Sequence, residues 1–330
     1  MTSGMGIGDL ARSLALRKST GATQKALSRA MQEATTGAPI DRSARLGGDH
    51  RLDSRLNTRL ASLAAWRTTA TEAALSAAAM QESLTSLKES LESGRQSAIL
   101  ASSTEDPASQ RAVANDLHAR FGAAVSTINM QSSGQPVFGG AAASGPAIKE
   151  AAAILAGLAD AISASGAQTP SDIAETVSGW FDTPANYYLG DSQARSPVQI
   201  GAGEAVSLSL RADAPVFRQT LEALALGALS ASLPDAQRGT MIGLAALRMS
   251  EATDGVVAAA ADLGTTEARI DAVRTRNSAE ETATKARLVE IAGVDPYDAA
   301  IDLDATQKQL ELLYELTGRL SSLTLTNYLR

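Results

Sequence analysis

The sequence contains no cysteine among its 330 residues. Disulfide bonds, thiolate metal sites and cysteine nucleophiles are therefore excluded. The two histidines, His50 and His118, lie far apart among charged residues, so a histidine-based metal or catalytic site is not expected. Aromatic residues make up only 3 % of the chain, whereas 44 % is hydrophobic, chiefly Ala and Leu. This composition favours slim, closely packed helices over the core of a large globular enzyme.

Long apolar runs are also missing. No stretch approaches the ~18 consecutive apolar residues that a transmembrane helix requires. The most apolar segment, residues 151–162, is too short and is interrupted by Asp160. At the N-terminus the basic residues follow the apolar ones, the reverse of their order in a secretory signal. We therefore expect no membrane span, and export, if it occurs, by another route.

Charge is distributed unevenly along the chain, whose formal net charge is −7. Residues 1–60 hold ten basic and five acidic residues, whereas residues 251–315 hold six basic and fourteen acidic residues. A basic N-terminal segment could bind nucleic acid, but this one has no aromatic residue to stack on a base. We expect the basic segment to pair with the acidic one, and we expect no nucleic-acid partner.

An apolar heptad over residues 66–91 predicts a long helix. At 1.5 Å per residue the helix would be ~39 Å long, and an ordinary core stripe would be shorter and wider. The spacing therefore favours a coiled-coil-like bundle. The heptad consists of Trp66, Ala70, Ala73, Ala77, Met80, Leu84, Leu87 and Leu91.

Two Asp-Pro pairs predict helix starts, because Asp caps a helix and Pro suits its first position. They are Asp106-Pro107 and Asp295-Pro296. The apolar stripe after the first pair is Val113, Leu117, Phe121, Val125 and Ile128, and that after the second is Leu313, Leu316, Leu320 and Leu323. Between the pairs, a heptad series contains two polar members, which help to fix register. This series is Val256, Leu263, Ile270, Asn277, Thr284 and Ile291.

The middle of the chain has a different pattern. Glycines and prolines interrupt the periodicity at 129–146, and residues 196–212 alternate around Gly201 and Gly203 as in a β-hairpin. The expected strand residues are Val198 and Ile200 before the turn and Val206, Leu208 and Leu210 after it. With five of the eleven aromatic residues also gathered nearby, we interpret residues 141–233 as an inserted mixed α/β domain.

Sequence motifs for catalysis are lacking. The segment GAGEAV at 201–206 is only a weak match to a nucleotide-binding turn, since it lies between two alternating strands. No GxxxxGK[ST], HExxH or GxSxG is present. Asp302 and Asp304 are two residues apart and would point to different faces of a helix. We expect neither an enzyme nor a bound cofactor or metal.

Five segments, in chain order, resemble the bacterial flagellin-like proteins, and within them the hook-filament junction proteins, or third hook-associated proteins. These segments are EATTGAPIDRSARLGGDHRLDSRL (33–56), ASSTEDPASQRAVANDL (101–117), INMQSSGQPVFGGAAA (128–143), NYYLGDSQARSPVQIGAGEAV (186–206) and LSSLTLTNYL (320–329). Together they extend over nearly the whole chain.

The resemblance implies a mainly α fold: a flagellin-like elongated bundle of long N- and C-terminal helices with an inserted smaller mixed α/β domain. Residues 1–40 and 296–330 would be terminal helices that form an inner tube on assembly. Residues 41–140 and 234–295 would form a helical bundle domain, and residues 141–233 the insert.

The resemblance also implies a function, an adaptor that joins the hook-side junction protein (the first hook-associated protein) to the flagellin filament. It implies self-association in a ring and a location in the extracellular flagellum. Export would use the flagellar type III apparatus without a cleaved signal, with a chaperone guarding the chain beforehand. The expected assembly interface consists of Ile7, Leu10, Leu14, Leu313, Leu316, Leu320, Leu323, Leu325, Tyr328 and Leu329.

Two alternatives stay open on the sequence. Flagellin itself, the filament subunit, is the first, although the Pro-Val-Phe-Gly-Gly turn and the Tyr-x-Gly-Asp segment look more like the junction proteins. A cytoplasmic helical signalling scaffold would also be rich in Ala and heptads, but it predicts a continuous antiparallel coiled coil with no β insert at 186–210.

Overall fold

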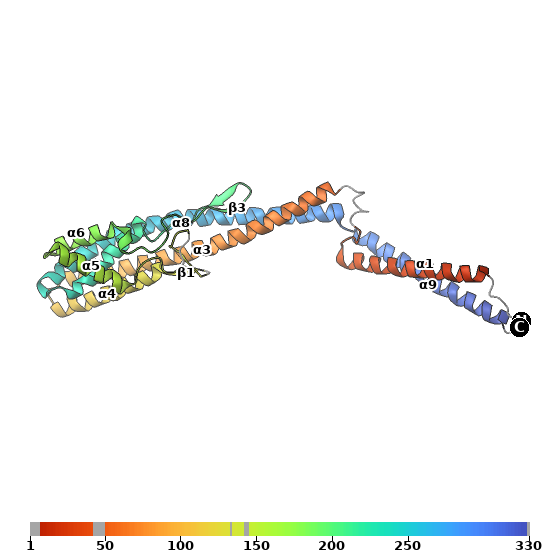
Figure 1. The fold of residues 1–330 in the computed structure, drawn as a ribbon, viewed down its shortest axis with the longest axis horizontal. Coiled ribbons are helices and arrows are strands. Elements are labelled where there is room, and N and C mark those ends of the chain that lie inside the picture. Colours follow the sequence, from red (N-terminus) through yellow and green to blue (C-terminus); the bar gives the residue numbers. More distant parts are fainter. Residues whose placement is uncertain (1–6, 42–49, 133, 142–144, 329–330) are drawn as a thin grey trace. The chain divides into compact units, whose positions relative to one another are not determined.

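A computed structural model of the chain describes residues 7–41, 50–132, 134–141 and 145–328, with side chains placed for these residues except 7–10, 12, 292 and 320–328. The chain forms two compact units, Met1–Leu63 with Ser278–Arg330 and Ala64–Asn277. The boundary falls within two long helices, α3 (Arg51–Ser102) and α8 (Asp235–Ala292). Figure 1 shows the elements along the chain.

The unit formed by residues 64–277 contains α4 (Pro107–Ile128), α5 (Ala151–Ser165), α6 (Pro170–Phe181) and α7 (Pro215–Leu229), besides its parts of α3 and α8. Short 3₁₀ turns, η1 (Pro184–Asn186) and η2 (Ser230–Ser232), follow α6 and α7. One continuous hydrophobic core joins residues of α3, α4, α7 and α8. Helix α7 packs against α4 and is buried on every side from 221 to 228.

The approach of α7 to α4 depends on a glycine. A Cβ at Gly227 would lie 2.8 Å from Leu117 Cδ1, closer than real carbon atoms pack. Glycine therefore brings the two backbones together at the centre of the core. The cost of glycine within a helix is offset by the burial of both helices.

The predicted heptad on α3 is confirmed. Trp66 is half-buried, and the seven residues from Ala70 to Leu91 in that series are buried. The heptad on α8 is confirmed for five of its six members, the polar Asn277 and Thr284 included, whereas Ile291 is only half-buried. Asn277 Nδ2 donates a 2.8 Å hydrogen bond to the Ile200 carbonyl. That bond supports the idea that a polar heptad position fixes register.

Both Asp-Pro predictions are confirmed. Helix α4 begins at Pro107, and the Asp106 carboxylate accepts hydrogen bonds from the backbone N–H groups of Ala108 and Ser109. Helix α9 (Pro296–Tyr328) begins at Pro296, and Asp295 Oδ1 accepts a 2.8 Å bond from Tyr297 N–H. These side chains satisfy backbone donors that a helix start leaves free.

The predicted hairpin is present but shorter than expected. Strand β3 (Val198–Gly201) pairs antiparallel with β4 (Glu204–Val206), with a bulge between Gln199 and Gly201. Leu208 and Leu210 lie beyond the second strand, because regular pairing ends at Val206. A second small hairpin, β1 (Gln131–Ser132) with β2 (Gln135–Pro136), falls in the segment where we predicted only a break.

The region 141–233 is richer in helix than the sequence indicated, because it contains α5, α6 and α7 as well as the hairpin. The hairpin at 198–206 argues against the signalling-scaffold alternative, which requires no strands there. The three-part division of the chain predicted from the sequence stays a prediction.

The other unit, residues 1–63 with 278–330, contains α1 (Ile7–Thr36) and α9, which pack against each other. Helix α1 ends at a Thr-Gly turn, where Gly37 has a φ of +65° and donates its N–H to the Glu33 carbonyl. Such a left-handed residue closes a helix, and glycine adopts that conformation without strain.

Candidate assembly surface

Helices α1 and α9 pack through one narrow seam. The residues that are least exposed recur at spacings of four and three along both helices. On α9 they are Ala299, Leu303, Thr306, Leu310 and Leu313, and on α1 they are Leu16, Thr20, Thr23, Leu27 and Ala30. This is the spacing of a two-stranded coiled coil. Most of these side chains are only half-buried, since each helix has a single partner within the described unit.

Two hydrogen bonds fix the antiparallel register of the pair. Gln24 Nε2 donates a 2.8 Å bond to the Tyr314 hydroxyl oxygen. Near the other end, Val294 N–H donates a 3.0 Å bond to the Gly37 carbonyl, so the turn after α1 meets the turn before α9. The two helices are therefore tied at separated points along their length.

The predicted interface residues fall into three groups. Leu14 and Leu316 are exposed, at 67 % and 50 %, whereas Leu313 is half-buried in the seam. Ile7 and Leu10 lie in α1, and Leu320, Leu323, Leu325 and Tyr328 lie in α9, but their side chains fall outside the described part. Leu329 lies outside the described residues altogether. The interface as a whole stays a prediction.

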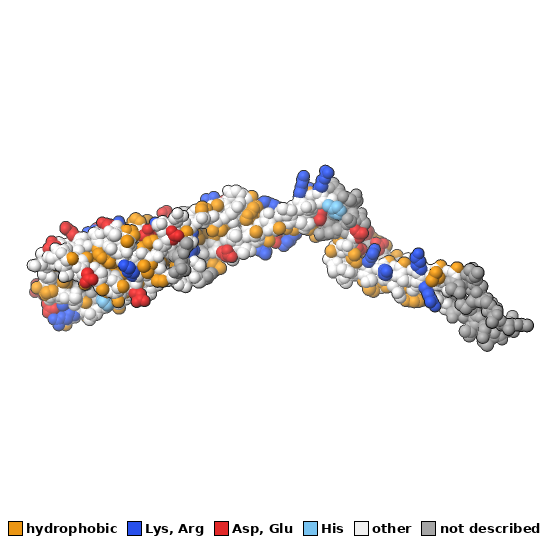
Figure 2. Space-filling view, viewed as in Figure 1, with side chains coloured by type: hydrophobic (Ala, Val, Ile, Leu, Met, Phe, Trp, Pro, Cys, Tyr) orange, Lys and Arg blue, Asp and Glu red, His pale blue; other side chains and the backbone are white. Residues whose placement is uncertain are grey.

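The structure adds exposed apolar residues that sequence reasoning missed, and three of those on α9 share one side of the helix by their spacing. Tyr297, Ile301 and Leu312 are 74 %, 49 % and 59 % exposed. With Leu316 they are spaced by four, eleven and four residues, and eleven residues make about three helical turns. That spacing was the signal available in the sequence. Hydrophobic and basic side chains are both visible on the surface of the helix pair in Figure 2.

Charges differ between the two helices. The described part of α1 exposes Arg17, Lys18, Lys25 and Arg29, and α9 exposes Asp298, Asp302, Asp304, Glu311 and Glu315. On α9, Lys308 pairs locally with Asp304 and Arg319 with Glu315, each at 2.6 Å. The Asp304 carboxylate raises the pKa of Lys308. The basic and acidic segments also meet elsewhere in this unit, where Arg59 donates to both carboxylate oxygens of Glu280 at 2.5 and 2.7 Å.

In the unit of residues 64–277, two segments that carried the family resemblance pack directly together. Asp191 N–H donates to the Gly139 carbonyl at 2.8 Å, and Ala141 N–H donates to the Gln193 carbonyl at 2.9 Å. Gly140 has a φ of +83°, and a Cβ there would lie 2.6 Å from the Asp191 carbonyl oxygen. The Pro-Val-Phe-Gly-Gly turn and the Tyr-x-Gly-Asp segment are therefore one interlocked element.

The aromatic residues near this element pack against one another. The rings of Trp180, Phe181 and Tyr187 cluster with centroids 5.0 to 6.3 Å apart. Burial raises the pKa of Tyr187 to about 12, and burial likewise raises the pKa of Tyr188 to about 12. Both phenols therefore stay protonated near neutral pH and would serve poorly as catalytic bases.

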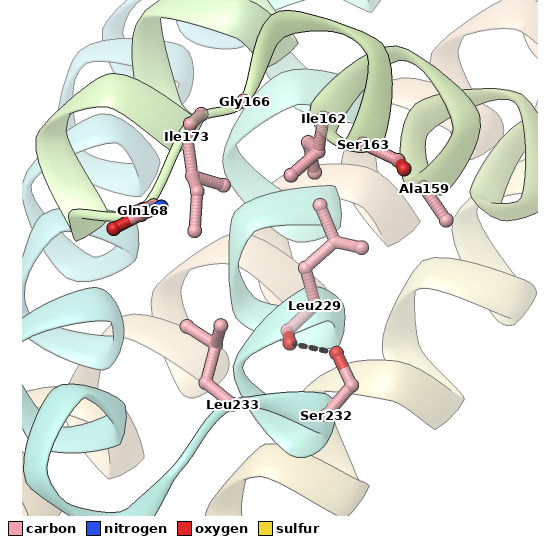
Figure 3. A pocket seen from close by; sticks show the side chains of 10 residues that line it. Ala159, Ile162, Ser163, Gly166, Gln168, Ile173, Leu229, Ser232 and Leu233 are labelled. Atoms are coloured by element: carbon pink, nitrogen blue, oxygen red, sulfur yellow. Dashed lines mark hydrogen bonds between the residues drawn. The ribbon is translucent and has the colours of Figure 1, made fainter.

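Two cavities lie among the described residues of the same unit. A cavity of about 390 Å³ between α5, α6 and the end of α7 is lined only by uncharged residues, among them Ile162, Ile173 and Leu229 (Figure 3). In the wall of this cavity, Ser232 Oγ donates a 2.8 Å hydrogen bond to the Leu229 carbonyl, so this hydroxyl is already paired within the protein. Within the described residues, no group of three or more His, Cys, Asp or Glu could hold a metal ion, and none of the helices has the apolar length for a bilayer crossing.

A smaller polar cavity of about 170 Å³ surrounds Glu222 on α7. Burial raises the pKa of this carboxyl group, while Arg248 on α8, whose Nε lies 3.8 Å from Glu222 Oε1, opposes the shift. Arg218 pairs with Asp182 at 2.7 Å, and Arg248 pairs with Glu251 at 3.0 Å. The acidic and basic side chains of this cluster compensate one another's charge. The cluster therefore fits a structural role, in which ion pairs link α6, α7 and α8.

Comparison with known proteins gives two findings. Residues 247–329 match the family model of the bacterial flagellin C-terminal helical region. This match includes most of α8 and all of α9. No curated protein sequence matches the chain significantly.

Solved structures with a similar fold include two flagellar proteins. One is a flagellar hook-associated protein from Vibrio parahaemolyticus, with a TM-score of 0.51 and 14 % identity over 72 % of this chain and 94 % of that one. The other is FlgL from Bacillus cereus, with a TM-score of 0.53 and 12 % identity over 70 % of this chain and 97 % of that one.

These findings confirm the resemblance to flagellin-like proteins and the mainly helical fold with long terminal helices. The fold is the one found in the two hook-associated proteins, and the family match is confined to the C-terminal helical region.

Proposed function

We propose that this flagellin-like chain is a structural adaptor of the bacterial flagellum, joining the hook-side junction protein to the flagellin filament. Its role is assembly, without catalysis. The proposal includes self-association in a ring, an extracellular place in the flagellum, and type III export after protection by a chaperone. The C-terminal family match and the fold shared with hook-associated proteins support it.

The observation that carries the proposal is the incomplete burial of the α1–α9 pair. Two helices with only one seam leave large apolar side chains, such as Leu14 and Leu316, in water. Fully burying a leucine is worth about 1.5–3 kcal/mol, so contact with neighbouring subunits would stabilise these helices. We assign residues 1–40 and 296–330 to the inner tube, with 41–140 and 234–295 as the bundle and 141–233 as the insert.

The first experiment is deletion of the gene in the source bacterium, followed by electron microscopy of the flagella and an assay for flagellin in the medium. Bare hooks with abundant secreted flagellin would support the adaptor role, because export then works while the filament has no base. Bare hooks without any flagellin would mean that the chain is the filament subunit. Normal filaments would refute both roles.

Complementation with single substitutions tests the proposed surface. We expect Leu316→Asp to leave the monomer folded and soluble but to abolish filament attachment, since a charge would enter a buried contact. Leu100→Asp is the matched control, because Leu100 is 72 % exposed in the other unit. The control should restore filaments. Equal restoration by both variants would show that α9 does not pack against a neighbour at Leu316.

A further inference from the structure

The β3–β4 hairpin lies against both long helices of the unit formed by residues 64–277, and Figure 1 shows β3 beside α8. On the α3 side, Thr69 Oγ1 donates a 2.7 Å hydrogen bond to the Gln199 carbonyl. On the α8 side, Asn277 Nδ2 donates a 2.8 Å bond to the Ile200 carbonyl. Two adjacent residues of one strand therefore join two helices that are far apart in the sequence.

A β-bulge frees the carbonyl that α8 binds. The strand pairing skips Ile200, because the register shifts between Gln199 and Gly201. The extra residue of a bulge has no partner in the ladder. Here the Asn277 side chain supplies the missing donor to the Ile200 carbonyl. A Cβ at Gly201 would lie only 3.1 Å from Val273 Cγ1, so glycine also lets the strand backbone approach α8 closely.

Glu204 on β4 adds a charged fastening to the same helix. Its carboxylate accepts a 2.9 Å hydrogen bond from Arg276 Nη2 and a 3.3 Å bond from Arg269 Nη2. These arginines are seven residues apart, about two helical turns, so both lie on one face of α8. Their hydrogen bonds lower the pKa of Glu204, which keeps the carboxylate charged near neutral pH. Since both arginine side chains are exposed, salt screens these ion pairs and loosens the fastening.

The direct seam between α3 and α8 is thin beside the hairpin. After Thr69, the next three heptad residues of α3 are alanines, namely Ala70, Ala73 and Ala77. An alanine buries only one methyl group, so it gains less from burial than the leucines further along the helix. The hairpin places two larger side chains, Ile200 and Val206, in the same core. It therefore supplies apolar contact that the two helices lack on their own.

The compact unit ends where these contacts end. On α8 its last residue is Asn277, and on α3 its first residue, Ala64, lies just over one helical turn before Thr69. We propose that the hairpin is a releasable strap, which fastens α3 to α8 and thereby sets the end of the compact unit. When the strap is released, residues 64–79 and 264–277 open together while the rest of the unit stays folded. This inference goes beyond the assembly role and does not depend on it.

Amide hydrogen exchange of the full chain tests this proposal. The strap variant is Thr69→Val/Glu204→Gln, which removes the bond from α3 and weakens the ion pairs to α8 with little change in side-chain size. Its matched control is Thr71→Val/Glu251→Gln, because these two side chains bond within their own helices. Both variants lose one hydroxyl and one carboxylate charge, but only the first loses contacts with the hairpin.

In the strap variant, exchange over 64–79 and 264–277 should rise about tenfold or more, while exchange over 221–228 stays unchanged. The control should leave all three segments unchanged. The proposal is overturned if the strap variant exchanges like the unaltered chain. An equal rise over 221–228 would also overturn it, because the hairpin would then stabilise the whole unit instead of one end. The adaptor role would stand in either case.

Ionic strength gives an independent readout on the unaltered chain. Raising the salt concentration from about 0.01 to about 1 M shortens the screening length from about 30 to about 3 Å. Exchange over 64–79 and 264–277 should then speed up several-fold, and exchange over 221–228 should not. Glu204→Gln alone should abolish most of that response, whereas Glu251→Gln should retain it. A full salt response in Glu204→Gln, with its helices intact by far-UV circular dichroism, would contradict the proposal.

Discussion

The two compact units solve the problem of burying apolar side chains in opposite ways. In residues 64–277, α7 is covered on all sides over 221–228 and the heptad of α3 faces a continuous core. In the α1–α9 pair, the seam leucines are half-buried and large apolar residues remain in water. The first arrangement is complete within one chain, whereas the second leaves apolar side chains that the proposed assembly would cover. Stability and the proposed assembly role thus fall to different parts of one sequence.

The largest expected difference between the two units is in amide hydrogen exchange of the free monomer. Amides of 221–228 in α7 should exchange only through global unfolding, whereas those of 13–30 and 303–319 should exchange through local opening. We expect protection factors to differ by roughly a thousandfold or more. Exchange measured by mass spectrometry checks this, and equal protection in both helix sets would remove the contrast between the units.

Truncation of one apolar side chain in each unit should also give unequal losses of stability. Phe121→Ala opens a cavity in the core and should lower the free energy of unfolding by about 3–5 kcal/mol. Leu14→Ala, at an exposed site, should change it by less than about 0.5 kcal/mol. Urea denaturation of both variants gives the comparison. A loss above ~1 kcal/mol for Leu14→Ala would mean that the Leu14 side chain is already buried in the monomer.

Two asparagines provide a matched pair for hydrogen bonding. Asn277 is buried and donates to the Ile200 carbonyl at 2.8 Å, whereas Asn57 is exposed and donates to the Asp53 carbonyl at 2.9 Å. Asn277→Ala should cost about 1–3 kcal/mol because a buried carbonyl loses its donor. Asn57→Ala should cost well under about 1 kcal/mol, since water replaces the lost bond. Similar losses in chemical denaturation would argue against register control by Asn277.

The smallest predicted effect concerns Glu222, whose pKa is raised chiefly by burial from an ordinary value of 4.5. A raised folded-state pKa means that the folded chain binds the proton more tightly than the unfolded one. The stability that protonation contributes is therefore complete below about pH 4.5 and is lost as pH rises through the folded pKa. At pH 7 Glu222→Gln should be the more stable chain, with a gain that shrinks toward pH 4.

Its control is Glu251→Gln, which changes an exposed carboxylate in the same cavity. Thermal unfolding at pH 7 and pH 4 would show whether only the Glu222 variant has the pH-dependent gain. If that variant is less stable at pH 7, the pairing with Arg248 outweighs the burial of the carboxyl group.

Much of the helical framework was predictable from local signals. The heptad of α3, the Asp-Pro starts of α4 and α9, and the Thr-Gly end of α1 all depend on spacing or capping within a few residues. Such signals are readable because they are short in range. The hairpin around Gly203 belongs to the same class, since turn chemistry determines it.

Helix α7 escaped prediction for a physical reason. A helix buried on all sides has no polar face, so it shows no amphipathic period along the sequence. Helix α6, by contrast, had a usable signal: Thr169 and Asp172 form a capping box with Pro170 at the first helical position.

The candidate surface was only partly predictable. Leu14 and Leu316 were expected on it, but Tyr297, Ile301 and Leu312 were not. Those three fall on the side of α9 away from its seam with α1, and which side faces α1 depends on tertiary packing rather than on the local pattern.

The interlocked glycine turn has a consequence for the engineering of related chains. Gly140 meets the Asp191 carbonyl, and Gly190 meets the Gly139 carbonyl, so closely that neither could carry a Cβ. Two stretches about fifty residues apart therefore behave as a single exchangeable part. A chimera that replaces only one of the two stretches would pack a foreign backbone against the native one. A chimera that replaces both would keep the glycine contacts between them.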